Sequence, residues 1–345
     1  MRAYYRKHVL EFKRPSGTSR GVLTTKETYF LIVEDGGKRG IGECGILRSL
    51  SVDDVPDYEA QLQWVCAHID LGEAALLCAL KAFPSIQFGV EQAFRGLRAQ
   101  RWYELFPSDF TMGRASIGIN GLIWMGTPEY MKAQIKDKIS HGFGCIKMKI
   151  GAIDFEEEYL LLKALRREFS VEDIEIRVDA NGAFAPEAAV DVLARLADLG
   201  LHSIEQPIKA GQWAAMARLC ETSPLPIALD EELIGVFDLE QKKRLIEEIK
   251  PQYIILKPSL IGGYRASEEW ISLAEAHKVG WWVTSALESN IGLNAIAQWT
   301  YTLGNTMPQG LGTGSLYTNN IAFPLAVEGG LLRVNFSEPV TFPFS

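Results

Sequence analysis

The chain has 345 residues, of which 47% are hydrophobic and 23% are charged, and its formal net charge is −8. This composition is typical of a globular protein with a large core, and an acidic chain without a basic stripe argues against a nucleic-acid partner. No apolar run approaches the ~20 residues of a membrane span, and five cysteines without C-x-x-C spacing suggest reduced thiols. We therefore expect a cytoplasmic protein with no membrane or nucleic-acid partner.

The first third of the chain predicts a small α+β unit over residues 1–110. Residues 3–12 and 27–34 have strand patterns, and residues 15–20 between them are typical of a loop. The glycine-rich stretch 40–45 lacks the pattern of a phosphate-binding loop. Helical patterns then follow over residues 57–69, 72–82 and 86–99.

From about residue 114, short apolar strands alternate with helices. We expect strands over residues 115–120, 145–151, 174–179, 203–205, 226–230, 253–257, 281–285 and 309–311. Units of this βα kind imply a parallel sheet, and this number of them favours an α/β fold with a (β/α)₈ barrel over residues 111–324. An open doubly wound sheet is the alternative, but no G-x-G-x-x-G opens a helix. The tail, 325–345, is expected to pack back on the N-terminal unit.

Two lysines, Lys147 and Lys149, lie in the strand expected at 145–151. Residues two apart in a strand point to the same side, so both ammonium groups enter one space. Burial and the neighbouring positive charge would lower the pKa of a lysine toward the ~7–8 that suits a general base. Taken alone, the pattern also fits a solvated edge strand.

Carboxylates end the next strands of the predicted barrel. Asp179, Glu205 and Asp230 follow Lys149 at intervals of roughly one βα unit, and Lys257 ends the strand after them. Buried acids at neighbouring strand ends repel one another, and a divalent cation would relieve this repulsion. Oxygen ligands without Cys or His favour Mg²⁺, with Mn²⁺ as a substitute. Each acid alone could be a helix cap or a solvated turn residue.

These residues together resemble the enolase superfamily, in its muconate-lactonizing branch. The resemblance rests on Lys147-Met-Lys149, Asp179-Ala-Asn181, Glu205-Gln-Pro207, Asp230-Glu-Glu232 and Lys257-Pro258. It implies a modified TIM barrel beneath an N-terminal α+β capping domain, with Mg²⁺ on the three acids. It also implies proton abstraction next to a substrate carboxylate, so the partner is a small-molecule carboxylate, with Asn181 and Glu231 behind the site.

Two later stretches resemble those of the o-succinylbenzoate synthases within this branch. They are Ser285-Ala-Leu-Glu-Ser289-Asn-Ile-Gly292 and Gly310-Leu-Gly-Thr-Gly314, in which Gly312 replaces the usual acid. The resemblance implies that Ser285, Ser289, Gly310 and Leu311 contact the substrate. Arg20, Leu47 and Arg48 of the capping loops could also reach it, or could be ordinary surface residues.

The resemblance implies a syn-dehydration of 2-succinyl-6-hydroxy-2,4-cyclohexadiene-1-carboxylate to 2-succinylbenzoate, a step of menaquinone biosynthesis. Lys149 would remove and return the proton, Lys147 would tune its pKa, and Lys257 would act as a cation–π partner. N-acylamino acid racemisation is the nearest rival. Dipeptide epimerisation ranks lower, because no acid follows Gln309 before Tyr317 to hold an amino group. A non-catalytic barrel is disfavoured, because it would be expected to have lost at least one of the ligand residues and none is missing. A homo-oligomer is left open.

Overall fold

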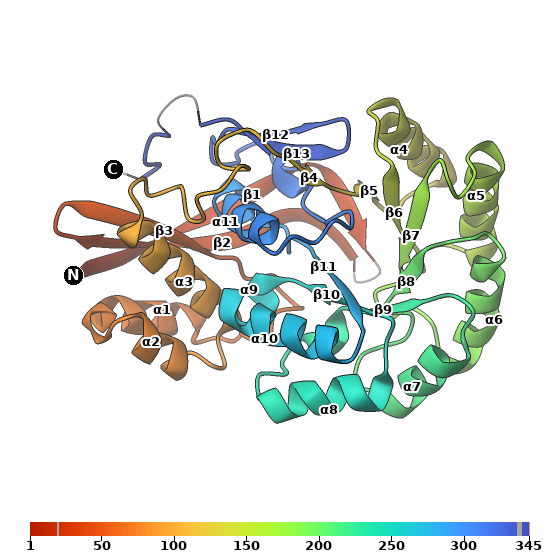
Figure 1. The fold of residues 1–345 in the computed structure, drawn as a ribbon, viewed down its shortest axis with the longest axis horizontal. Coiled ribbons are helices and arrows are strands. Elements are labelled where there is room, and N and C mark those ends of the chain that lie inside the picture. Colours follow the sequence, from red (N-terminus) through yellow and green to blue (C-terminus); the bar gives the residue numbers. More distant parts are fainter. Residues whose placement is uncertain (19–20, 337–339, 345) are drawn as a thin grey trace.

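The computed structural model describes residues 1–18, 21–336 and 340–344. A parallel barrel wrapped by helices occupies one side of the molecule, and an antiparallel sheet with helices α1–α3 occupies the other (Figure 1). The predicted α/β class, with an α+β region before the barrel, is confirmed.

The N-terminal sheet pairs its strands in the order β1 (Arg2–Thr18), β2 (Gly21–Asp35) and β3 (Lys38–Cys44). One expectation was wrong here, and one strand had not been predicted. Strand pairing continues through most of the expected 15–20 loop, after a register shift beyond Glu11, and β3 was not predicted as a strand. Residues 19 and 20 lie outside the described part. The helices are α1 (Tyr58–Ala67), η1 (Ile69–Leu71), α2 (Glu73–Ala79) and α3 (Pro84–Arg98).

The glycines of β3 explain how helix α3 packs on the sheet. A Cβ added at Gly40 would clash with the backbone of Ala93, and one at Gly42 would clash with the backbone of Gly89. The glycine-rich stretch is therefore a close helix–strand crossing, since only glycine lets the two backbones approach so near. Tyr29 and Leu62 lie in the core beneath it.

The barrel strands run parallel in the order β11-β10-β9-β8-β7-β6-β5. They are β5 (Gly121–Ile123), β6 (Cys145–Lys149), β7 (Glu175–Asp179), β8 (Ser203–Glu205), β9 (Ile227–Leu229), β10 (Tyr253–Leu256) and β11 (Gly280–Val283). The helices are α4 (Pro128–Ser140), α5 (Phe155–Glu168), α6 (Pro186–Ala197), α7 (Trp213–Thr222), η2 (Glu231–Leu233), α8 (Leu239–Ile249), α9 (Pro258–Ile261), α10 (Gly263–Ala276), α11 (Asn290–Thr302) and η3 (Thr313–Ser315). Helix α4 follows a Thr127 cap, whose hydroxyl accepts from the Tyr130 amide.

The barrel closes through a short seam in place of the expected eighth strand. Gln309 forms a parallel bridge with Ile119, and Gly310 forms one with Thr284. The first barrel strand also begins later in the sequence than expected, at Gly121. The chain pairs with the C-terminal hairpin at β4 (Ile117–Gly118), then turns to the seam, and joins β6 only from Gly121 onward.

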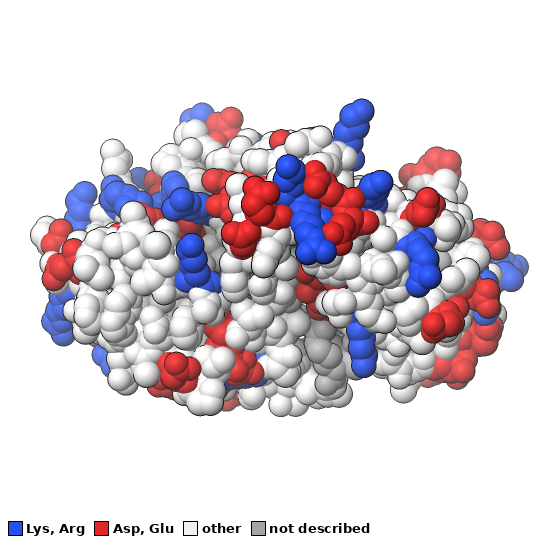
Figure 2. All heavy atoms as spheres, turned by 90° about the horizontal axis from the view of Figure 1, so that it is seen from below, with Lys and Arg blue, Asp and Glu red and all other residues white. Residues whose placement is uncertain are grey.

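The C-terminal segment touches both parts of the fold. Strands β12 (Leu325–Glu328) and β13 (Leu331–Val334) form a hairpin, and β13 pairs with β4. Beyond it, the ring of Phe344 lies 5.0 Å from that of Phe30 on the N-terminal sheet. On the face in Figure 2, acidic and basic side chains are interspersed. Among the described helices, none combines the length and apolarity needed to cross a membrane.

Candidate active site

The pairing register places the predicted charged residues at one end of the barrel. Lys149 on β6 is level with Asp179 on β7, which is level with Glu205 on β8. Asp230 and Lys257 follow directly after β9 and β10. Because parallel strands share their carboxyl edge, these side chains meet at the end of the barrel where this fold keeps its active sites.

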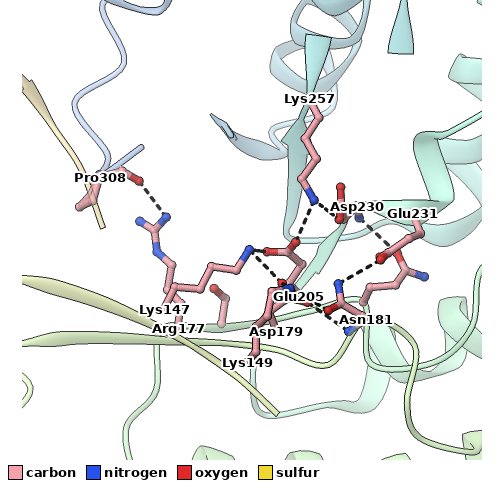
Figure 3. Close-up of polar contacts among 12 residues, drawn as sticks. Lys147, Lys149, Arg177, Asp179, Asn181, Glu205, Asp230, Glu231, Lys257 and Pro308 are labelled. Carbon is pink, nitrogen blue, oxygen red and sulfur yellow. Dashed lines mark hydrogen bonds and ion pairs between the residues drawn. The ribbon is translucent and has the colours of Figure 1, made fainter. Parts of the chain in front are cut away.

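Lysine ammonium groups lie between the acids in this ring (Figure 3). Lys149 Nζ is 2.8 Å and Lys147 Nζ is 3.1 Å from the same oxygen, Asp179 Oδ2. Lys147 also pairs with Glu205. Lys257 pairs with Asp230, and its Nζ lies 3.6 Å from Glu205 Oε1. Six residues from five strand ends thus form one buried ion-pair network.

The pKa of Lys147 is shifted in the direction opposite to the one that the sequence pattern suggested. Burial disfavours the charged form of Lys147, but Asp179 and Glu205 outweigh burial, so the pKa of Lys147 is raised. The pKa of Lys257 is raised in the same way, with Asp230 as its strongest partner. The expectation that Lys147 has a lowered pKa is therefore wrong, because the negative charges of Asp179 and Glu205 outweigh both burial and the positive charge of Lys257.

The acids differ in their response to burial. Burial opposes ionisation of Asp179, but Lys147 and Lys149 together hold its pKa well below the usual range. Burial raises the pKa of Asp230 well above the usual range, since Lys257 compensates it only in part and Glu231 and Glu205 lie nearby. Asp230 is thus the acid that most needs a further cation to ionise.

Asn181 and Glu231 lie behind Lys149, where the sequence had placed them. Lys149 Nζ donates to Asn181 Oδ1 at 2.7 Å, and Asn181 Nδ2 donates to Glu231 Oε1 at 3.0 Å. The second bond orients the amide so that its oxygen faces the lysine. Asn181 has φ +46°, a left-handed conformation that Asn tolerates better than most residues.

Gln206 was not predicted as part of the site. Its Oε1 accepts from the amides of Asp230 and Glu232, and its Nε2 donates to Glu232 Oε2 at 3.0 Å. Its own φ is +41°, which is strained for a glutamine. Gln206 thereby holds the turn that carries Asp230. The only signal in the sequence was its place beside Glu205.

The three acids at the strand ends fit a divalent cation, although lysine ammonium groups lie between them. In the described part of the chain, no cluster of three or more His, Cys, Asp or Glu forms a ready metal site. The donors are nevertheless all carboxylate oxygens, as Mg²⁺ prefers. Glu205 Oε1 is buried and accepts no hydrogen bond from any described residue, so one ligand oxygen is still available.

A cavity of about 810 Å³ opens above this network. Lys147, Lys149, Asp179 and Lys257 line its inner end. Segments of the N-terminal region line its outer part, including the 47–50 stretch. The charged ring is therefore accessible to a small molecule enclosed between the barrel and the N-terminal region.

Residues 130–337, more than half of the chain, match the family model described as "Enolase C-terminal domain-like". An o-succinylbenzoate synthase from Desulfotalea psychrophila is 47% identical, and the match covers 97% of this chain and 99% of the relative. The chain belongs to the enolase superfamily. The predicted family and its muconate-lactonizing branch are thus confirmed.

Two solved structures support the fold. The crystal structure of MenC from Desulfotalea psychrophila aligns with a TM-score of 0.87 and 44% identity, covering 97% of this chain and 99% of that one. A dipeptide epimerase from Enterococcus faecalis aligns with a TM-score of 0.82 at 19% identity, covering 97% and 96% of the two chains. That enzyme was solved with Mg and the dipeptide L-Leu-L-Tyr. Its likeness shows the fold alone.

Ser285 lines the cavity, as the superfamily resemblance implied, but its hydroxyl is already in use. It donates to Glu288 Oε2 at 2.5 Å and accepts from Thr313 Oγ1 and the Glu288 amide. A hydroxyl has one proton and two lone pairs, so Ser285 has no donor left for a substrate carboxylate. Glu288 is fully buried, and no sequence pattern indicated its role.

Of the other residues predicted to bind substrate, some lie at the cavity and others do not. Gly310 and Leu47 line the cavity. Ser289 and Leu311 are fully buried, and Ser289 Oγ donates to Glu43 Oε2, so the structure places neither at the cavity. Arg48 reaches the lining, but its guanidinium pairs with Glu27 and Asp54. Arg20 lies outside the described residues.

Proposed function

We propose that this protein is an o-succinylbenzoate synthase, which dehydrates 2-succinyl-6-hydroxy-2,4-cyclohexadiene-1-carboxylate to 2-succinylbenzoate. The observation that carries the proposal is the ring of lysines and carboxylates at the barrel end, in a chain that matches an o-succinylbenzoate synthase over nearly its whole length. The cytoplasmic location and any homo-oligomer stay predictions.

Asp179, Glu205 and Asp230 would hold a Mg²⁺ ion. Their donor set is all oxygen. Glu205 Oε1 accepts no hydrogen bond from a described residue and Asp230 is buried, and both features favour a further cation. When bound, Mg²⁺ would stabilise the negative charge that develops on the substrate carboxylate.

Lys149 is the proposed base and acid. Two of its three Nζ directions point to Asp179 and Asn181. The remaining direction is available to the cavity that Lys149 lines, and there it can accept a proton from substrate carbon and return it. In the reaction, the α C–H bond and the bond from carbon to the hydroxyl group break on one face. The transferred proton leaves with the hydroxide as water, and the ring becomes aromatic without any redox change.

Lys147 and Lys257 keep the site charged. Lys147 compensates Asp179 and Glu205 beneath the substrate, and Lys257 compensates Asp230 from the other side of the acids. The raised pKa of Lys257 keeps it cationic, as a cation–π partner of the substrate ring must be.

The test is an ultraviolet assay of aromatisation with Mg²⁺, with EDTA, and after Mg²⁺ is restored. We expect turnover only with the metal, and a loss of at least about a thousandfold in Lys149→Ala. Arg195→Lys is a surface control, because Arg195 pairs with exposed Glu156 and is not among the residues that line the cavity. Full turnover in EDTA or in Lys149→Ala would overturn the proposal.

Racemisation of N-acylamino acids is the second candidate. It is favoured by one observation, that lysines from β6 and from the end of β10 both reach the carboxylate network and line the cavity. Two bases on opposite faces of one carbon are what a racemase requires. Exchange of solvent deuterium into an N-succinylamino acid measures this activity directly.

A further inference from the structure

The edge strand β1 is interrupted by a large bulge where it reaches the barrel. Strands β1 and β2 extend from the N-terminal sheet to the barrel strands (Figure 1). Residues 12–15 of β1 lie opposite Thr24 alone, and regular pairing resumes at Ser16. Pro15 has no N–H for strand pairing and is therefore tolerated in a bulge. A bulge changes the direction of the side chains that it contains, and bulges are common next to active sites.

The bulge is attached to the barrel at both of its ends. Phe12 forms an antiparallel bridge with Tyr317, and Gly17 forms one with Met125. A Cβ at Gly17 would lie 2.7 Å from the carbonyl oxygen of Met125, so the two backbones are in close contact. Tyr317 follows the seam and Met125 follows β5. The bulge therefore lies over the rim at the carboxyl end of the barrel, where the ion-pair network also lies.

Arg14, within the bulge, is exposed and lines the cavity. Its guanidinium has no hydrogen bond or ion pair to any residue that the structure describes. A guanidinium carries N–H donors in a planar fork, which can bind both oxygens of a carboxylate. Arg14 thus offers accessible donors of the right chemistry for an anion in the outer part of the cavity.

Most other cations of the cavity lining already have acidic partners. The three lysines at the inner end are paired with the three acids of the network. Arg48, which lies near Arg14 in the outer lining, pairs with Glu27 and Asp54, each at 2.6 Å. These charges are balanced within the protein, so they offer less to a second anionic group than Arg14 does.

Lys138 on α4 also lines the cavity and has no ion pair to a described residue, but it lies behind β5. A Cβ at Gly121 would lie within 3.2 Å of three carbons of the Lys138 side chain. The next strand residue, Leu122, is level with Lys147. Successive strand residues point to opposite faces, so Lys138 packs on the outer face of the barrel wall, with its Nζ 5.1 Å from the centre of the Phe143 ring.

We propose that Arg14 binds the second carboxylate of the substrate, at the end of its succinyl chain, and thereby determines a preference for dianionic substrates. This inference rests on the proposed function, in which the ring carboxylate lies at the inner end of the cavity. The succinyl chain then extends outward, and its carboxylate needs a cation there. Arg14 supplies that cation from the N-terminal region.

The test measures the binding of two ligands to the intact protein with Mg²⁺ by calorimetry. The product 2-succinylbenzoate ends in a carboxylate, and in 2-butyrylbenzoate a methyl group takes its place. Arg14→Met removes the charge and keeps a long side chain, whereas Arg14→Lys keeps the charge without the planar fork. Lys138→Met is the matched control, because it removes another cation of the lining that lies on the outer face of the wall.

The preference for 2-succinylbenzoate over 2-butyrylbenzoate should fall about tenfold in Arg14→Met and about threefold in Arg14→Lys. The affinity for 2-butyrylbenzoate should stay the same in both variants. Arg14→Met should also raise KM about tenfold and change kcat less than about threefold. Lys138→Met should change the preference less than about twofold. All three variants should melt like the parent, since neither side chain makes an ion pair with a described residue.

An unchanged preference in Arg14→Met overturns the proposal. An equal fall in Lys138→Met also overturns it, because the overall charge of the cavity would then explain the preference without a contact to Arg14. So does an equal loss of affinity for both ligands, which would indicate a disturbed cavity. The proposed function is tested separately: a parent protein that aromatises the substrate, with an unchanged preference in Arg14→Met, refutes only the role of Arg14.

Discussion

Ser285 lines the cavity, yet its hydroxyl donates at 2.5 Å to the buried carboxylate of Glu288. Glu288 also accepts from Ser259, so both of its oxygens are occupied by hydroxyl donors. Ser285, which follows β11, therefore donates its proton to a buried carboxylate and not to a substrate.

Ser285→Ala should therefore act mainly on stability. It removes one donor from a buried charge, which should lower the free energy of unfolding by about 1–3 kcal/mol. KM should change less than about threefold. Denaturant unfolding and steady-state kinetics measure the two effects. A KM increase of tenfold or more with unchanged stability would restore Ser285 as a substrate ligand.

Arginine substitutions distinguish the roles of the two catalytic lysines. Arginine keeps the charge but cannot act as a base at neutral pH. Lys257→Arg should keep dehydration within about a hundredfold of the parent, because a cation is what the proposed role requires. Lys149→Arg should lose about a thousandfold or more.

The same pair of variants measures the racemase candidate. Lys257→Arg should abolish any deuterium exchange that requires a second base, while dehydration persists. Equal losses of dehydration in the two variants would contradict the division of roles. Circular dichroism of both variants checks that the fold is retained.

Two glycines of the Gly310–Gly314 stretch should differ in their tolerance of a side chain. A Cβ at Gly312 would have only ordinary contacts, 3.6 Å from Ile119 Cδ1 and 3.7 Å from Asn120 O, whereas one at Gly310 would collide with Thr284. Gly312→Ala should change stability by less than about 1 kcal/mol, and Gly310→Ala should cost about 1–3 kcal/mol. Thermal unfolding compares them.

Gly312→Asp tests the electrostatics of that position. It would place a carboxylate in the cavity lining, at a position where a Cβ has only ordinary contacts. KM for a dianionic substrate should rise about tenfold or more through like-charge repulsion, and Gly312→Asn is the neutral control. Equal KM values in the two variants would show that the substrate does not approach this residue.

Glu91 should make stability depend on pH. This carboxylate on α3 accepts from the amides of Tyr264 and Arg265 at the start of α10, at 2.5 and 3.2 Å. Burial raises its pKa from 4.5 to about 8. Because this pKa is higher in the folded than in the unfolded protein, the protonated form of Glu91 stabilises the fold. This stabilisation is complete below about pH 4.5 and is lost as the pH rises to about 8.

The comparison with Glu91→Gln isolates this contribution. Between pH 4.5 and 8 the parent should lose a few kcal/mol of unfolding free energy relative to the variant, since one pKa unit is about 1.4 kcal/mol. Urea unfolding at several pH values measures the difference. A difference that does not change with pH would show that Glu91 ionises normally in the folded protein.

The sequence alone determined the βα alternation and the residue types at the strand ends. Each acid or lysine follows an apolar run at intervals of one βα unit, and parallel strands bring such positions to one edge whatever the details of packing. For that reason Lys149, Asp179, Glu205, Asp230 and Lys257 could be placed together from spacing. Family resemblance then suggested the reaction.

Only the tertiary structure decided which polar atoms already have a hydrogen-bond or ion-pair partner. The raised pKa of Lys147 and the commitment of Ser285 to Glu288 both depend on contacts that no local pattern encodes. Ser289 shows this most clearly: its partner Glu43 is 246 positions away. Strand periodicity sets where a side chain points, but its partner is set by packing between elements that are distant in the sequence.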